Sequence, residues 1–130
     1  MKNFETVYKE LEDLFIKQFP DYINKVNIAH NDGIILKPFE NTKLEEDCLK
    51  KPCFKFKLEK TEYSEKDRII ENSCFTNSFE ILLPVHEENK VISLYRYFEA
   101  IDKMFEEMES DRIYRITEIK ENKIIIQITD

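Results

Sequence analysis

The chain has 130 residues, a formal net charge of −7 at pH 7 and a hydrophobic fraction of 42%. This length predicts one domain, residues 1–130, with enough apolar side chains for its own core. The acidic excess argues against nucleic acid as a partner, because affinity for DNA or RNA comes mainly from cations that contact phosphates. The single glycine, Gly33, excludes glycine-rich nucleotide loops and the nucleophile elbow, which need several glycines.

The first predicted element is an amphipathic helix over residues 3–18. Its apolar side chains recur at helical spacing, and charged side chains occupy the opposite side. Asn3 is a suitable N-cap residue for this helix. Pro20 is expected to end it, because proline lacks the N–H group that a helix interior requires.

Two short elements are predicted before the main strands. Residues 26–37 predict a hairpin, because an Asp-Gly pair in their middle supplies the positive φ angle that tight turns require. A helical turn over residues 22–26 is an alternative for the start of this segment. Thr42 and Glu45 have the spacing of a capping box, which indicates a short helix over residues 44–50.

The following residues predict the strands of a sheet. Residues 53–60 alternate between apolar and charged side chains, which is typical of a half-buried strand. After a polar turn over residues 61–66, residues 68–85 return as a second long strand, so that the two form a long hairpin. Residues 113–129 predict a closing hairpin. Its last strand is expected to be central, because apolar residues occupy both of its faces.

Residues 88–109 predict the second main helix. Their apolar side chains keep a three-four spacing and form one stripe. A single stripe on each of the two main helices must be buried against an apolar surface, which the sheet offers in a chain of this length. The predicted fold class is therefore α+β, with an antiparallel or mixed β-sheet, two main amphipathic helices packed on one face and a long β-hairpin.

The sequence predicts neither a membrane span nor an export signal. An acidic residue, Glu5, lies within the first five positions, where an export signal would be basic and then apolar. The sequence also has no long apolar run. Three cysteines, Cys48, Cys53 and Cys74, are an odd number in a chain without a predicted export signal. They are therefore expected to be reduced thiols in the cytoplasm.

No metal site, cofactor or catalytic residue is predicted. Cys48, Cys53, Cys74 and His86 are ligand types that zinc uses, but their spacing lacks the two tight pairs of a structural zinc site. The carboxylate clusters fall on the polar sides of predicted helices or in loops, where solvation explains them. A small enzyme that uses Cys74 or His86 is retained only as a third hypothesis.

A basic stretch stands out in this acidic chain. Its members are Lys50, Lys51, Lys55, Lys57 and Lys60. On one interpretation these lysines form the solvent face of a strand, where they also prevent edge-to-edge aggregation. On the other interpretation they form a docking face for an acidic neighbour.

The motif Lys66-Asp67-Arg68 precedes the predicted strand Phe75–Pro84, and a predicted helix follows after a polar gap. In this pattern the chain from residue 66 onward resembles small phage and prophage tail-terminator, or tail-completion, proteins. The order of elements agrees over essentially the whole chain, although the insert at residues 41–52 departs from that family. The resemblance implies a non-enzymatic structural protein whose copies form a ring at the head-proximal end of a tail tube. Tail-tube and head-joining proteins would be its partners, in the host cytoplasm or the virion.

The predicted self-association or docking surface lies on the long hairpin. Arms that exceed the usual strand length of about 5 to 6 residues are expected to project beyond the core. Positive charge on this hairpin would meet carboxylates of a neighbouring subunit in the head-to-tail contact of a ring. The alternative function is a stand-alone cytoplasmic protein-binding or regulatory module. The residues predicted for the surface are Lys57, Lys60, Tyr63, Arg68 and Phe75.

Overall fold

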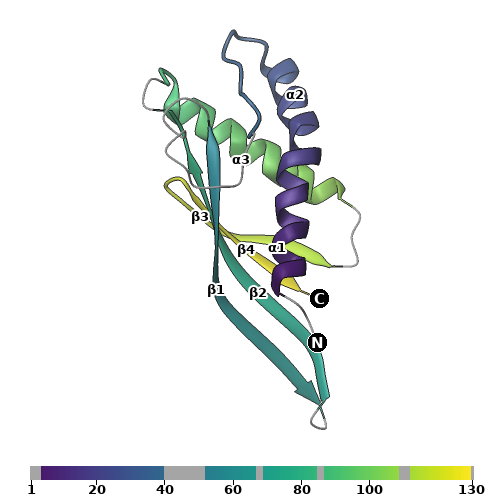
Figure 1. The fold of residues 1–130 in the computed structure, drawn as a ribbon. Coiled ribbons are helices and arrows are strands. Elements are labelled where there is room, and N and C mark those ends of the chain that lie inside the picture. The colour runs from purple at the N-terminus through teal and green to yellow at the C-terminus, as the bar shows by residue number, and fades with distance from the viewer. Residues whose placement is uncertain (1–3, 40–51, 67–68, 85–86, 109–111, 130) are drawn as a thin grey trace.

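A computed structural model describes residues 4–39, 52–66, 69–84, 87–108 and 112–129 of the chain. The helices lie on one side of a four-stranded antiparallel sheet, so the fold is α+β, as predicted (Figure 1). The helical elements are α1 (Phe4–Asp13), the π-helical segment η1 (Leu14–Gln18), α2 (Phe19–His30) and α3 (Lys90–Glu107). The strands are β1 (Cys53–Lys66), β2 (Ile69–Leu82), β3 (Ile113–Lys120) and β4 (Lys123–Thr129).

The first helical region is longer than the sequence predicted. Residues 4–30 are helical throughout, so the expectation that the helix ends at Pro20 was wrong. Pro20 lies in the first turn of α2, directly after the π-helical segment η1. A proline is tolerated there because the first N–H groups of an α-helix have no acceptor within it.

The hairpin predicted over residues 26–37 is absent from this part of the chain, because α2 continues to His30. Asn31 ends α2 in the left-handed conformation, with φ of 43°, and Gly33 follows with φ of 88°. The Asp-Gly pair therefore does mark a chain reversal, but at a helix C-terminus. The amide side chain of Asn27 replaces a strand partner, since it accepts a 2.8 Å hydrogen bond from the Leu36 N–H and donates to the Leu36 carbonyl. The helix predicted over residues 44–50 lies outside the described residues.

The sheet has the strand order β1-β2-β4-β3. Strand β1 includes residues 61–66, which the sequence predicted as a turn, because pairing with β2 continues past two register shifts. The closing hairpin of β3 and β4 was predicted correctly, and β4 is a central strand, as expected. The side chain of Ile125, on the face of β4 away from the core, is only half-buried.

The core lies between the helices and one face of the sheet. Phe15 of η1 packs against Phe79 of β2, while Phe105 of α3 packs against Tyr114 of β3. Strand register places Phe79 and Tyr114 on the same face of the sheet, since Tyr114 pairs with Ile128 and Ile128 pairs with Phe75. Both main helices therefore cover one face, as predicted.

Candidate functional site

The β1–β2 hairpin projects beyond the rest of the sheet (Figure 1). β2 pairs with β4 only from Cys74 to Glu80, whereas pairing between β1 and β2 continues outward to Lys66 and Ile69. Residues 63–66 and 69–73, here called the arm, thus form a ribbon that has no third strand within the described residues. Because two-stranded ribbons are barely stable alone in water, contact with another surface would stabilise the arm.

The five residues predicted for a docking surface do not share one surface. The pairing of β1 with β2, whose register shifts between Leu58 and Lys60, places Lys57 and Lys60 on the open face of the sheet, opposite the helices, whereas Tyr63 lies on the helix-facing side. Phe75 is 1% exposed and packs edge-to-face on Phe4, so its assignment to an exposed surface was wrong. The reason is that α1 begins directly above this part of β2. Arg68 lies outside the described residues.

The lysines on the open face differ in their ion pairing. Lys60 lies 3.1 Å from a carboxylate oxygen of Glu62, and both side chains are exposed. Lys55 and Lys57 are exposed too, and neither has an ion-pair partner among the described residues. Among the described side chains of β1, these two positive charges therefore remain available to a carboxylate of another molecule.

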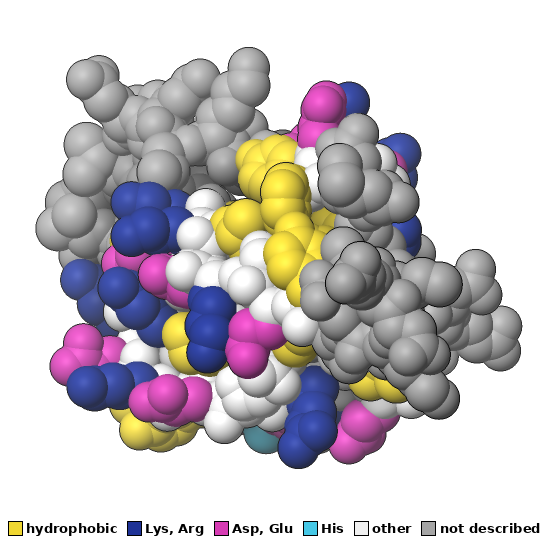
Figure 2. Space-filling view, turned by 90° about the horizontal axis from the view of Figure 1, so that it is seen from below, with side chains coloured by type: hydrophobic (Ala, Val, Ile, Leu, Met, Phe, Trp, Pro, Cys, Tyr) yellow, Lys and Arg dark blue, Asp and Glu magenta, His cyan; other side chains and the backbone are white. Residues whose placement is uncertain are grey.

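A groove of about 230 Å³ lies where α1 crosses the base of the hairpin. Phe4, Tyr8 and Leu58 line it and are exposed, and Figure 2 shows hydrophobic side chains gathered on this end of the molecule, with basic and acidic side chains beside them. The sequence analysis missed this site. Its lining residues are Phe4, Glu5, Val7 and Tyr8 of α1, Phe56 and Leu58 of β1, and Phe75 and Asn77 of β2.

Asn77 is the unusual member of the groove lining. Its side chain occupies a core-facing position of β2 between Phe75 and Phe79, and it is 7% exposed. Its Nδ2 group is buried and has no hydrogen-bond acceptor in the described part of the chain. Such a group is rare, since nearly all buried polar groups in native proteins have a hydrogen-bond partner. A polar residue within this apolar alternation was the available sequence signal.

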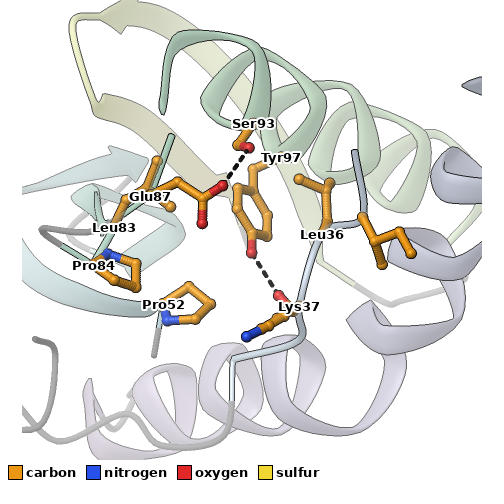
Figure 3. A pocket seen from close by; sticks show the side chains of 9 residues that line it. Leu36, Lys37, Pro52, Leu83, Pro84, Glu87, Ser93 and Tyr97 are labelled. Atoms are coloured by element: carbon orange, nitrogen blue, oxygen red, sulfur yellow. Dashed lines mark hydrogen bonds between the residues drawn. The ribbon is translucent and has the colours of Figure 1, made fainter. Parts of the chain in front are cut away.

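A second, smaller cavity of about 150 Å³ lies beside α3 (Figure 3). The Tyr97 hydroxyl donates a 2.5 Å hydrogen bond to the Lys37 carbonyl, and the Ser93 hydroxyl lies 3.5 Å from a Glu87 carboxylate oxygen. Burial holds the pKa of Tyr97 well above its ordinary range, so this hydroxyl remains a protonated donor. The hydroxyl of Tyr97 thus joins the segment after α2 to α3, which is a structural role.

An ion pair between Asp32 and Arg96 also connects the turn after α2 to α3. The guanidinium of Arg96, in α3, donates to both carboxylate oxygens of Asp32 and also to the Ile34 carbonyl. Hydrogen bonding to Arg96 lowers the pKa of Asp32 well below its usual range. Because the guanidinium stays charged and the carboxylate stays ionised, this pair offers no proton donor or acceptor near neutral pH.

The described residues contain no group of three or more His, Cys, Asp or Glu side chains that could hold a metal ion. Cys74 is a free, half-buried thiol, whereas Cys48, His86 and the side chain of Cys53 lie outside the described part. None of the described helices is long and apolar enough to cross a membrane.

No family model matches the chain, and neither a curated protein nor a solved structure matches it.

Proposed function

We propose that this protein is a non-enzymatic assembly protein whose copies associate through the β1–β2 hairpin. The observation that carries the proposal is the pairing of β1 with β2 far beyond the last residue that β4 covers. A ribbon of this kind gains stability when a neighbouring molecule packs on it. The resemblance to tail terminators adds the expected assembly, a ring at the head-proximal end of a tail tube, with tail-tube and head-joining proteins as partners.

The distribution of charge supports a head-to-tail contact. Lys55 and Lys57 present positive charge on the open face of the sheet, whereas acidic side chains such as Glu106 are exposed on the helical layer. Opposite signs on two sides of one subunit favour a contact between unlike surfaces, and such contacts can close into rings.

A stand-alone protein-binding module in the cytoplasm is the second candidate. The position of β1 at the edge of the sheet favours it, because an edge strand leaves backbone N–H and C=O groups available to an extended segment of another protein. In that case the protein would bind its partner without forming a ring of its own.

Sedimentation velocity at low and high salt tests the proposal. We expect wild type to assemble at low salt and to dissociate as salt rises, since exposed charges are screened within about 10 Å at 0.1 M. A Lys55→Glu, Lys57→Glu double variant should remain monomeric. The control is Lys37→Glu, Lys90→Glu, which makes the same change of charge on exposed lysines that lie outside the strands and should assemble like wild type.

Electron microscopy of the assembled fraction would show whether the oligomer is a ring. A wild-type protein that stays monomeric at high concentration and low salt, and that does not bind tail-tube ends, would contradict the assembly role. A monomer that captures a single partner protein through β1 would instead support the stand-alone module.

A further inference from the structure

We infer that the cavity of about 150 Å³ beside α3, here called the Glu87 cavity, binds a primary alkylammonium group. Such a group occurs at the end of a lysine side chain and in free amines. This site lies apart from the β1–β2 hairpin arm and does not depend on the proposed assembly. Three properties of the cavity select the ligand: an available carboxylate oxygen, apolar walls and a small volume.

One oxygen of the Glu87 carboxylate is available to a ligand. Oε1 accepts the 3.5 Å hydrogen bond from the Ser93 hydroxyl, whereas Oε2 has no hydrogen-bond or ion-pair partner among the described residues. Figure 3 shows this second oxygen pointing toward Pro52, Pro84 and Tyr97. Glu87 as a whole is half-buried, but Oε2 remains accessible to solvent and therefore to a ligand.

The charge of the cavity favours a cation. Lys37 is the only basic residue in the described lining, and no ion pair joins it to Glu87. The carboxylate of Glu87 is thus not neutralised by the described part of the chain, and the net charge of −7 attracts cations to the protein as a whole. A hydrogen bond from an ammonium group to this carboxylate would be charge-assisted, and such bonds are stronger than neutral ones.

The hydrogen bonding of Glu87 favours an ammonium group over a guanidinium group. A guanidinium binds a carboxylate best through both oxygens at once, but Oε1 already accepts a hydrogen bond from Ser93. An ammonium group is a compact charge and can bind through Oε2 alone. Calcium is disfavoured as well, because it takes about six to eight oxygen ligands and Glu87 is the only carboxylate in the described lining.

The walls of the cavity favour an alkyl chain behind the charged group. Apolar side chains come from three parts of the protein: Leu36 after α2, Pro52 before β1, and Leu83 and Pro84 after β2. Methylene groups that contact these side chains are removed from water, which adds to the free energy of binding.

The volume of the cavity limits the ligand to a small group. A water molecule occupies about 30 Å³ in the liquid, so the cavity has room for about five non-hydrogen atoms, the size of n-butylammonium. Pockets that enclose a drug-sized ligand are larger, at about 300 to 1,000 Å³. The ligand is therefore one amine with a short alkyl chain, or the end of a longer molecule.

Titration of the full chain with n-butylammonium at constant ionic strength, followed by the backbone amide chemical shifts in NMR spectra, tests the site. We expect saturable shifts at Ser93 and Tyr97. Glu87→Gln keeps an acceptor for Ser93 but removes the charge, so it should weaken binding at least about tenfold. Glu88→Gln is the matched control, because it removes the same charge from an exposed neighbour outside the lining and should bind like wild type.

A series of ligands checks the chemistry of the group that binds. n-Butanol has the same alkyl chain without the charge, and n-butylguanidinium has the charge in a planar fork. Each should bind wild type at least about tenfold more weakly than n-butylammonium does. This comparison uses the wild-type chain, so it decides the question even if Glu87→Gln does not fold.

The two sources of the ammonium group are distinguished by Nα-acetyl-lysine methylamide. Binding as tight as that of n-butylammonium would identify a lysine side chain of another protein as a ligand. Binding of n-butylammonium alone would identify a free amine. Absence of saturable shifts at Ser93 and Tyr97, or equal affinity of wild type and Glu87→Gln for n-butylammonium, would overturn the inference.

Discussion

The ring of Phe15 stacks on the ring of Phe79, with 4.3 Å between the ring centroids and 19° between the ring planes. Both side chains are fully buried. The Phe105 ring of α3 also contacts Phe15, at 6.2 Å between centroids. The two main helices and strand β2 therefore meet at Phe15, which should make this residue a principal determinant of stability.

Replacement of Phe15 by alanine should lower the free energy of unfolding by about 3 to 5 kcal/mol, because it removes a large core side chain and leaves a cavity. Urea unfolding followed by circular dichroism would measure the change. Tyr95→Ala is a suitable control, since that side chain is exposed, and it should change stability by about 0.5 kcal/mol or less. Equal effects of the two substitutions would contradict the packing described for Phe15.

Tyr97→Phe should destabilise the fold by about 1 kcal/mol, the usual net contribution of one intramolecular hydrogen bond. The reason is that the Lys37 carbonyl loses its 2.5 Å donor while the ring of Tyr97 remains buried. Tyr95→Phe, at an exposed hydroxyl, provides the comparison in the same unfolding experiment. A Tyr97→Phe variant as stable as wild type would show that water replaces the hydroxyl without cost.

The ion pair of Asp32 with Arg96 should make stability depend on pH in the acidic range. The pKa of Asp32 is lower in the folded chain than in the unfolded chain, so the pair stabilises the fold fully above about pH 4. This stabilisation is lost as pH falls below that value. We expect the difference in unfolding free energy between wild type and Asp32→Asn to be constant near neutral pH and to shrink toward pH 2. A difference that does not change with pH would contradict the role given to this pair.

Gly33→Ala should cost about 1 kcal/mol through backbone strain alone. The φ angle of Gly33 is 88°, and no atom beyond Gly33 and its two chain neighbours lies within 4 Å of the position that a Cβ atom would occupy. Asn31→Gly is the matched change, because Asn31 already adopts a positive φ and glycine relieves its strain. Stability should therefore fall for the first variant and stay equal or rise for the second, as measured by thermal unfolding.

Local sequence patterns predicted the closing hairpin correctly, because apolar alternation and a two-residue turn specify it without help from the rest of the fold. They were misleading at Pro20 and at the Asp-Gly pair. Pro20 and the Asp-Gly pair each indicate only a local backbone conformation. Pro20 is compatible with a helix end, but also with the first turn of α2 after a π-helical segment. The Asp-Gly pair is compatible with a hairpin, but also with the turn that follows a helix C-cap. Tertiary packing determines which of these local structures forms.

For the groove, too, the sequence predicts one part of the structure and tertiary packing determines the rest. The alternation of Phe75, Asn77 and Phe79 reveals in the sequence that one polar residue occupies a core-facing position. Whether its amide has an acceptor depends on how α1 lies over β2, which no local pattern records. The exposure of Lys57 can be predicted from strand alternation alone. The burial of Phe75 could not be predicted without knowing that Phe4 packs on it.

Strand β4 lies between β2 and β3, although it is synthesised after both. Until residues 123–129 leave the ribosome, β1 and β2 can pair only with each other, and β3 has no neighbour in the sheet. The isoleucines of β4 that complete the apolar floor beneath the helices are missing for the same period. Folding is therefore expected to be completed in one late step, when translation reaches β4.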